Sequence, residues 1–370
     1  MTLPRDPEAV RVLAEKLARE HVAVGGKVVG YLTPCVPSEL IEAAGVLPMM
    51  LAAGPETSAT LGDRFMEDLF DTALRGVFER LLKGEFSYLS AIVLPRANDS
   101  AHRLYYYVSE IERTGEAKLP PVLLADVAMT PDNASRTYSI NALAALWDEL
   151  QDMAETEASD RDLRAAIEAS NRRGELLEEF VDRRRGLSGT VTGAQALAGF
   201  AAARMLPGDV FEEEMQALLD RGGTTRTGPR VIICGSAHDG AGLHGLIEGA
   251  GGIVVGDYHA TGELSIGEAI DKRKPPLEAI ADSYRVCRAA SRSFRDPGGE
   301  IADFAKACGA EAAVFSYFGE EEALTWDYPE QKRALEGIGV KIIRLNDQTR
   351  PFDVDANRSI VEALTRRGSA

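Results

Sequence analysis

Two stretches of this chain alternate short apolar runs with helical patterns, and this alternation restricts the fold more than any other feature. The apolar runs span 26–32, 47–52, 90–95 and 121–126 in the first third, and 230–235, 252–257, 312–317 and 340–346 in the last third. Strands that alternate with helices predict a parallel sheet with helices on both faces. We therefore predict an α/β protein with two parallel-sheet units around a shared cleft.

The region between these stretches carries a continuous helical pattern. Apolar residues recur there at three- and four-residue spacing, and Ser159 and Thr192 stand where helix N-caps are expected. We predict an N-terminal α/β domain (1–137), a helical segment (138–225) and a C-terminal α/β domain (226–370), with a linker at 221–230. Further helices are predicted near 38–45, 60–83, 100–115, 240–250, 275–295, 298–308 and 328–338.

Charge and hydropathy exclude two classes of partner. The net charge is −17, from 41 basic and 58 acidic residues; no Lys/Arg cluster stands out, and the basic run at 183–185 is short and preceded by acids. A nucleic-acid-binding protein needs a basic surface to neutralise phosphates, so no nucleic-acid partner is expected. The apolar runs are too short for a membrane span, and the first 20 residues lack the apolar centre of a signal peptide. We expect a cytoplasmic protein without a membrane partner.

The four cysteines show no metal-binding or redox spacing. They are Cys35, Cys234, Cys287 and Cys308, and no two form a C-x-x-C motif. Buried small hydrophobic residues are the expected role, with Cys287 and Cys308 on predicted helices. Cys35 and Cys234 each follow the first strand of a unit, so both are expected to face the cleft. A relocated metal site at these two cysteines stays open as an alternative.

Polar residues follow a strand of the first unit at the point where ligands of open α/β sheets collect. The sequence LPRANDSAHRLYYY (94–107) places Asn98, Asp99 and Ser100 in the turn and His102 in the first turn of the next helix. These residues are therefore candidates for binding or acid–base chemistry.

Three turns of the second unit carry similar candidates. CGSAHDGAGLHG (234–245) contains Gly235, Ser236 and His238, and GDYHATGELS (256–265) contains His259 and Thr261. The turn after 312–317 contains Glu320. Small residues allow close approach of the backbone to a ligand, and helix N-termini favour anions. Tight turns packed on the sheet, helix capping and solvated acidic runs are the competing interpretations.

The segments together resemble the 2-hydroxyacyl-CoA dehydratase and benzoyl-CoA reductase family. GYLTPCVPSELIEAAGVLPMML, IVLPRANDSAHRL, SDRDLRAAIEASNRRGELLEEF, GLIEGAGGIVVGDYHATGE and WDYPEQKRALEGIGVKIIRL resemble family segments in the family's order. The resemblance implies two flavodoxin-like units with a helical portion, and a [4Fe–4S] cluster held by three cysteines between them. It also implies an acyl-CoA substrate, a heterodimer with a paralogous subunit and an ATP-dependent activator protein.

The cluster positions that the resemblance implies carry no sulfur here. They fall at Phe70, at Asn98 and near Phe318 or Gly319. Iron–sulfur clusters are held by thiolates, a phenyl ring cannot donate to iron, and an amide is a poor substitute. We therefore expect neither a cofactor nor a metal site on this chain.

Three functions stay open. The leading hypothesis is a subunit of a dehydratase (lyase) or reductase (oxidoreductase) complex that binds an acyl-CoA and pairs with a cluster-bearing paralogue. The second is a cluster-free enzyme with Asp99, His102, His238 and Glu320 as acid–base groups, and the third is a non-catalytic CoA-ester binding or regulatory protein. The predicted substrate-binding residues are Thr33, Cys35, Pro37, Glu39, Phe70, Asn98, Ser100, Gly235, Ser236, His259 and Thr261.

Overall fold

The computed structural model describes residues 3–54, 60–67, 69–186, 191–221, 226–291 and 295–365. The first of its two sheets contains four parallel strands in the order β2-β1-β3-β4. They are β1 (Val28–Tyr31), β2 (Leu47–Met50), β3 (Ala91–Pro95) and β4 (Val122–Ala125). The two central strands, β1 and β3, are buried along their whole length, which explains why they appear in the sequence as continuous apolar runs.

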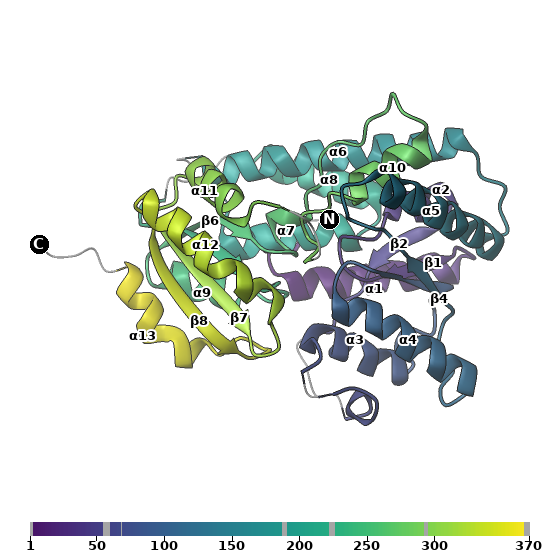
Figure 1. Ribbon diagram of the computed structural model, residues 1–370, viewed down its shortest axis with the longest axis horizontal. Helices are drawn as coiled ribbons and strands as arrows, with labels where there is room; N and C mark the ends of the chain where they lie inside the picture. Colours follow the sequence, from purple (N-terminus) through teal and green to yellow (C-terminus); the bar gives the residue numbers. More distant parts are fainter. Residues whose placement is uncertain are drawn as a thin grey trace, which may run out of the picture.

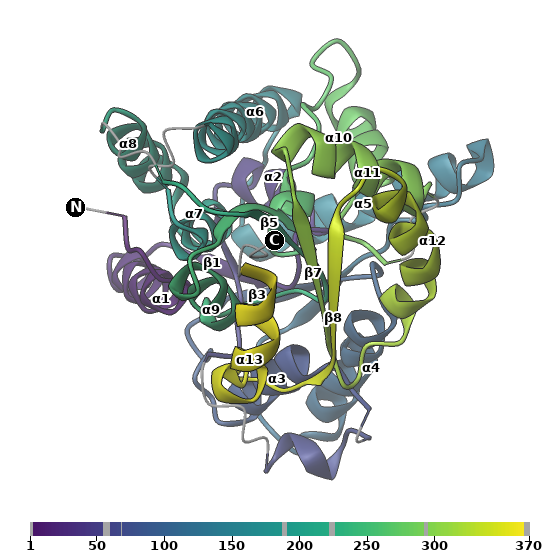
Figure 2. The same ribbon diagram turned by 90° about the vertical axis from the view of Figure 1, so that its left-hand side faces the viewer.

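The second sheet repeats this topology, with four parallel strands in the order β6-β5-β7-β8. They are β5 (Arg230–Gly235), β6 (Ile253–Tyr258), β7 (Ala312–Phe318) and β8 (Lys341–Gln348). Helices α11 and α12 cover one face of this sheet, and α9 and α13 cover the other (Figure 2). The prediction of two flavodoxin-like units is therefore confirmed.

The helices of the two units differ from the predictions mainly at their ends. The first unit has α1 (Pro7–Ala23), α2 (Ser38–Ala43), the 3₁₀ turn η1 (Gly62–Arg64), α3 (Thr72–Leu82) and α4 (Asp99–Thr114). The helix predicted from 60 begins only at Thr72, because the Asp71 carboxylate accepts hydrogen bonds from the N–H groups of Ala73 and Leu74 and caps α3 there.

The second unit has α9 (Gly242–Gly249), the 3₁₀ turn η2 (Glu263–Ser265), α10 (Pro276–Tyr284), α11 (Pro297–Cys308), α12 (Ala323–Gly337) and α13 (Val354–Thr365). The helix predicted over 275–295 ends at Tyr284, and Cys287 lies in the turns that follow. Helix α13 was not predicted. Residues 222–225 of the predicted linker, and 292–294, lie outside the described residues.

Four helices form the middle segment: α5 (Asn133–Ala154), α6 (Asp160–Arg185), α7 (Gly193–Met205) and α8 (Gly208–Leu219). Capping boxes at Ser159 and Thr192 begin α6 and α7, as predicted. Their apolar faces join the core of the first sheet. None of the described helices is both long and apolar enough to span a bilayer.

Helix α6 reaches both units. It runs along the top of the molecule in Figure 1. Ser170, in the middle of the helix, contacts α2, and Arg184, near its end, contacts β6. Helix α10 follows the second unit's β6 in sequence but packs against α5 and α6. Ile280 and Tyr284 of α10 belong to the core of the first unit, and Arg136 of α5 pairs with Asp282 of α10 at 2.6 Å. The packing of α6 and α10 therefore joins the two units, in addition to the connecting chain.

Candidate functional site

A cavity of about 960 Å³ lies at the carboxyl end of β1. Its wall comes from β1 and α2, from the middle of α6, from the end of α7 and from the segments 264–270 and 283–288. Open α/β sheets bind their ligands beyond the carboxyl ends of strands, and this volume lies at the upper end of the usual range for small-molecule sites. The cavity is the leading binding site on structural grounds.

Glu39 ties three of these elements together inside the cavity wall. Its carboxylate accepts a hydrogen bond from the hydroxyl of Ser170 at 2.5 Å and another from the hydroxyl of Tyr284 at 2.9 Å. Its side chain is buried, so these two donors replace the water that a carboxylate needs. Burial, together with the neighbouring charge of Glu39, raises the pKa of Tyr284 well above its usual value. The predicted binding residue Glu39 thus lines the cavity and also fixes its shape.

Two arginines of the cavity wall, Arg204 and Arg288, have no carboxylate partner among the described residues. The guanidinium of Arg204 donates to the backbone carbonyl of Ser265, but within the described part of the chain no carboxylate pairs with it and its Nε has no partner. Arg288 lines the same cavity, and among the described residues it too lacks an ion pair. By contrast, Arg173 is neutralised by Glu42 at 2.6 Å. A guanidinium without a carboxylate partner is a preferred ligand for phosphate or carboxylate groups.

A pair of thiols stands at the edge of the cavity. The sulfur atoms of Cys35, from the β1–α2 loop, and of Cys287, after α10, lie 3.2 Å apart. Burial and the hydrogen bond to Cys287 raise the pKa of Cys35 well above its usual value. The hydrogen bond from Cys35 lowers the pKa of Cys287 to about 7, assisted by the backbone N–H groups of Ala289 and Ala290. Cys287 also lines the cavity wall.

The other predicted residues of the β1–α2 loop shape its backbone. Thr33 has a φ of 62°, a left-handed conformation that few non-glycine residues adopt, and its hydroxyl accepts a hydrogen bond from the backbone N–H of Cys35. Thr33 thereby fixes the backbone of Cys35. Pro37 is the N-cap residue of α2. Cys234, by contrast, is fully buried in the core of the second sheet with Cys308.

The three positions at which the sequence resemblance implies cluster cysteines carry packing and capping side chains. The ring of Phe70 is fully buried against Tyr107, with 6.0 Å between ring centroids. The carboxamide oxygen of Asn98 caps α4 by accepting from the N–H of Ala101 at 2.7 Å. The guanidinium of Arg350 lies 3.8 Å above the ring of Phe318. None of these groups fits a [4Fe–4S] cluster, and the touching pair Cys35 and Cys287 supplies only two thiols.

The four predicted acid–base residues lie in different surroundings. Asp99 and Ser100 begin α4, where Asp99 is mostly exposed and pairs with Arg103 at 3.5 Å. His102 contacts the hydroxyl of Tyr106 at 3.3 Å. Glu320 accepts from the N–H and the hydroxyl of Thr72, at 3.0 and 2.7 Å, and so joins the second unit to α3. His238 belongs to the second unit's interior, and the catalytic role of all four stays a prediction.

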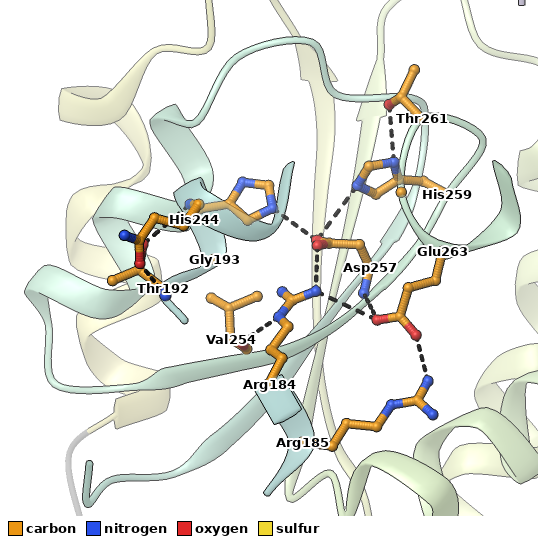
Figure 3. Close-up of polar contacts among 12 residues, drawn as sticks. Arg184, Arg185, Thr192, Gly193, His244, Val254, Asp257, His259, Thr261 and Glu263 are labelled. Atoms are coloured by element: carbon orange, nitrogen blue, oxygen red, sulfur yellow. Dashed lines mark hydrogen bonds and ion pairs between the residues drawn. The ribbon is translucent and has the colours of Figure 1, made fainter. Parts of the chain in front are cut away.

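A buried ionic cluster occupies the interior of the second unit (Figure 3). The guanidinium of Arg184 donates to the carboxylate of Asp257 at 2.7 Å and approaches Glu263 at 3.4 Å. His244 contacts the other oxygen of Asp257 at 2.7 Å, and His259 lies 3.5 Å from that oxygen. Burial alone would raise the pKa of Asp257, but Arg184 and His244 outweigh it and hold this pKa well below its usual value.

The predicted residues His238, His259 and Thr261 form one side of this cluster. The hydroxyl of Thr261 donates to the backbone carbonyl of His238 at 2.6 Å, so its oxygen accepts from Nδ1–H of His259 at 3.2 Å. Burial lowers the pKa of His238 well below its usual value, and it lowers the pKa of His259 in spite of Asp257. Both imidazoles are therefore neutral at pH 7.

Gly235 and Ser236 pack closely against the neighbouring strand β7, and Ser236 forms hydrogen bonds with it. Gly235 has a φ of 103°, and a Cβ atom there would lie 2.5 Å from the carbonyl oxygen of Ser316. The N–H of Ser236 donates to that same carbonyl at 2.9 Å, and its hydroxyl accepts from the N–H of Phe318 at 3.2 Å. These two predicted binding residues therefore have structural partners within the sheet.

Several cavity residues were not among the predicted site residues. Arg204 is the only charged residue of the apolar helix GAQALAGFAAARM, and a lone charge of this kind is the signal that would have singled it out. Tyr284, Cys287 and Arg288 lie more than 240 residues from the loop that they face, and no local pattern indicates that contact.

Comparisons with known proteins agree with the resemblance inferred from the sequence. A sequence model of the family "2-hydroxyglutaryl-CoA dehydratase, D-component" matches residues 34–365. The chain is 19% identical over 369 residues to the beta subunit of (R)-2-hydroxyglutaryl-CoA dehydratase from Acidaminococcus fermentans, with 96% of each chain covered. The family match covers every strand except β1, together with the middle helices and most of the cavity wall, so the chain belongs to the 2-hydroxyglutaryl-CoA dehydratase D-component family.

Proposed function

We propose that this chain is a subunit of a 2-hydroxyacyl-CoA dehydratase-type complex that binds an acyl-CoA thioester in the cavity beside β1. The observation that carries the proposal is the cavity of about 960 Å³ whose wall includes two guanidinium groups, Arg204 and Arg288, without carboxylate partners in the described chain. A CoA thioester carries several phosphate charges at one end, and a 2-hydroxydiacid adds a carboxylate at the other. Guanidinium groups that no carboxylate neutralises match both kinds of group.

We further propose that the chain carries no iron–sulfur cluster and pairs with a paralogous subunit that does. The side chains of Phe70, Asn98 and Phe318 supply no thiolate, and each is committed to packing or capping. Electron-transfer chemistry therefore needs its metal centre from another chain. An ATP-dependent activator protein would deliver its electron to that partner, while this chain holds the thioester.

Replacing Arg204 with glutamine is expected to weaken acyl-CoA binding by about 10- to 100-fold. The change removes a charge-assisted hydrogen bond to an anionic group, which contributes about 1.5–3 kcal/mol. The measurement is isothermal titration with (R)-2-hydroxyglutaryl-CoA, compared with free coenzyme A. Arg113→Gln is the matched control, because Arg113 is exposed and pairs only with Glu110 on α4.

Equal affinities of the Arg204→Gln, Arg113→Gln and unmodified proteins would contradict this location of the binding site. Thermal melting of each variant separates a loss of binding from a loss of fold. Tight thioester binding by the chain alone, with turnover in the absence of any second subunit, would instead favour a cluster-free enzyme.

The pairing is tested by co-expression with a paralogue that has cysteines at the three cluster positions. Anaerobic purification is expected to yield a heterodimer that contains iron and sulfide, whereas this chain alone contains neither in stoichiometric amount. Stoichiometric iron and sulfide in the chain alone would overturn the cluster-free assignment. If the two chains elute separately even at concentrations far above the dissociation constant of a stable complex, the proposed pairing is wrong.

A further inference from the structure

Two cysteines that are 252 positions apart in sequence meet in the fold. The sulfur atoms of Cys35 and Cys287 lie 3.2 Å apart, which is closer than two sulfur atoms in ordinary van der Waals contact and within reach of an S–H···S hydrogen bond. A disulfide bond measures about 2.05 Å. A shift of about 1 Å, shared between two loop residues, therefore separates the present arrangement from a covalent bond.

The two sulfur atoms differ in exposure and in pKa, as the attacking thiol and the resolving thiol of a disulfide exchange do. Cys287 lines the large cavity, so a small molecule can reach it, whereas Cys35 is 3% exposed and stands behind it among Ala97 and Ala290. The S–H···S contact and burial raise the pKa of Cys35, the same contact lowers the pKa of Cys287, and the positive charge of Arg204 favours the thiolate of both cysteines. Cys287 is thus the attacking thiol, and Cys35 is placed to resolve a mixed disulfide on it.

We propose that Cys35 and Cys287 form a reversible disulfide in the wall of the cavity, with a small-molecule disulfide of the glutathione class as the oxidant. The thiolate of Cys287 attacks one sulfur of the oxidant, forms a mixed disulfide and releases one thiolate. Cys35 then loses its proton, attacks the Cys287 sulfur and displaces the second thiolate. Two protein thiols are oxidised, and one small disulfide is reduced to two thiols.

This bond would join two segments of the cavity wall that are far apart in sequence. Cys35 belongs to the loop between β1 and α2, and Cys287 lies between Tyr284 and Arg288, both of which line the cavity. Drawing the sulfur atoms together moves that turn toward the loop. Oxidation is therefore expected to change the affinity of the cavity for its ligand, whatever that ligand is, so the inference does not depend on the proposed function.

The test uses the reduced full-length chain, oxidised glutathione as the probe, and intact-mass and peptide-mapping spectrometry. The unmodified protein is expected to lose two hydrogen atoms and to yield one Cys35–Cys287 cross-link. Cys35→Ser is expected to accumulate one glutathione on Cys287, because the resolving thiol is absent. In Cys287→Ser, modification of Cys35 should be at least about tenfold slower than cross-linking in the unmodified protein, because the buried Cys35 is mainly protonated. Cys308→Ser, at a buried cysteine of the second core, is the matched control and should cross-link as the unmodified protein does.

Two results would overturn the proposal. One is an unmodified protein that keeps both thiols free, or keeps glutathione on Cys287, under conditions in which Cys35→Ser is fully modified. The other is cross-linking to the same extent in Cys35→Ser or Cys287→Ser, which would assign the bond to other cysteines. Circular dichroism of each variant before oxidation shows that the fold is retained.

Discussion

Replacing Arg184 with methionine is expected to lower the free energy of unfolding by about 3–5 kcal/mol. The change leaves the carboxylate of Asp257 buried without its main cation, and Glu263 loses a second positive neighbour. Methionine fills much of the volume of the arginine stem, so the loss reports on charge more than on packing. The measurement is urea unfolding at pH 7, followed by circular dichroism.

Arg172→Met provides the matched control on the same helix. Arg172 is 55% exposed and lies 3.6 Å from Glu212, so its loss should change stability by no more than about 1 kcal/mol. Combining Arg184→Met with Asp257→Asn should cost less than the sum of the two single changes, because the charge that Arg184 neutralises is then absent. A loss below 1 kcal/mol for Arg184→Met alone would show that the cluster does not depend on this pair.

Stability is expected to fall as the pH drops below about 6.5, the ordinary pKa of histidine. Burial lowers the folded-state pKa values of His238 and His259, so below pH 6.5 the unfolded chain binds more protons than the folded one. Their contribution is complete above pH 6.5 and is lost as the pH falls toward the folded-state pKa values. Each imidazole that stays neutral in the folded chain costs about 1.4 kcal/mol per pH unit below pH 6.5.

The pH dependence is measured by urea unfolding between pH 5 and 8. His238→Gln should reduce the slope below pH 6.5 by up to one proton, and His21→Gln, at the end of α1 and outside the cluster, should leave it unchanged. Glu263 acts in the opposite direction because burial raises its pKa, so the comparison between variants isolates the histidine contribution. Equal slopes for His238→Gln and the unmodified protein would contradict the assignment.

The strands were predictable because their burial leaves a local trace. All eight apolar runs became strands, since central parallel strands are covered on both faces and are apolar throughout. Helix ends were less predictable because they depend on single caps, such as Asp71 before α3. Helix α13 escaped prediction because few of its described side chains are apolar and buried, with Val354 and Val361 packed on the second sheet.

The candidate site was predictable only in part, for a different reason. The loop with Cys35 and Glu39 stands at a strand end and was identified from the sequence, but the residues that complete the cavity come from α6, α7 and the turn after α10. A strand end also does not reveal whether the following loop folds over it. His238 and His259 follow strands of the second unit, yet both are buried beside Asp257, which only the tertiary packing determines.

The return of helix α10 to the first unit has a consequence for how the protein is made. The buried core of the first unit is completed by Ile270 and by Ala279, Ile280, Ala281 and Tyr284 of α10, whereas its other buried members precede residue 220. When synthesis has reached the linker at 221–230, the strands of the first sheet have been made. The apolar surface of α5 and α6 that α10 later covers is then still exposed to water. The ribosome must add some 60 further residues before that surface is covered, so the first unit is completed only after β5 and β6 of the second unit have been synthesised.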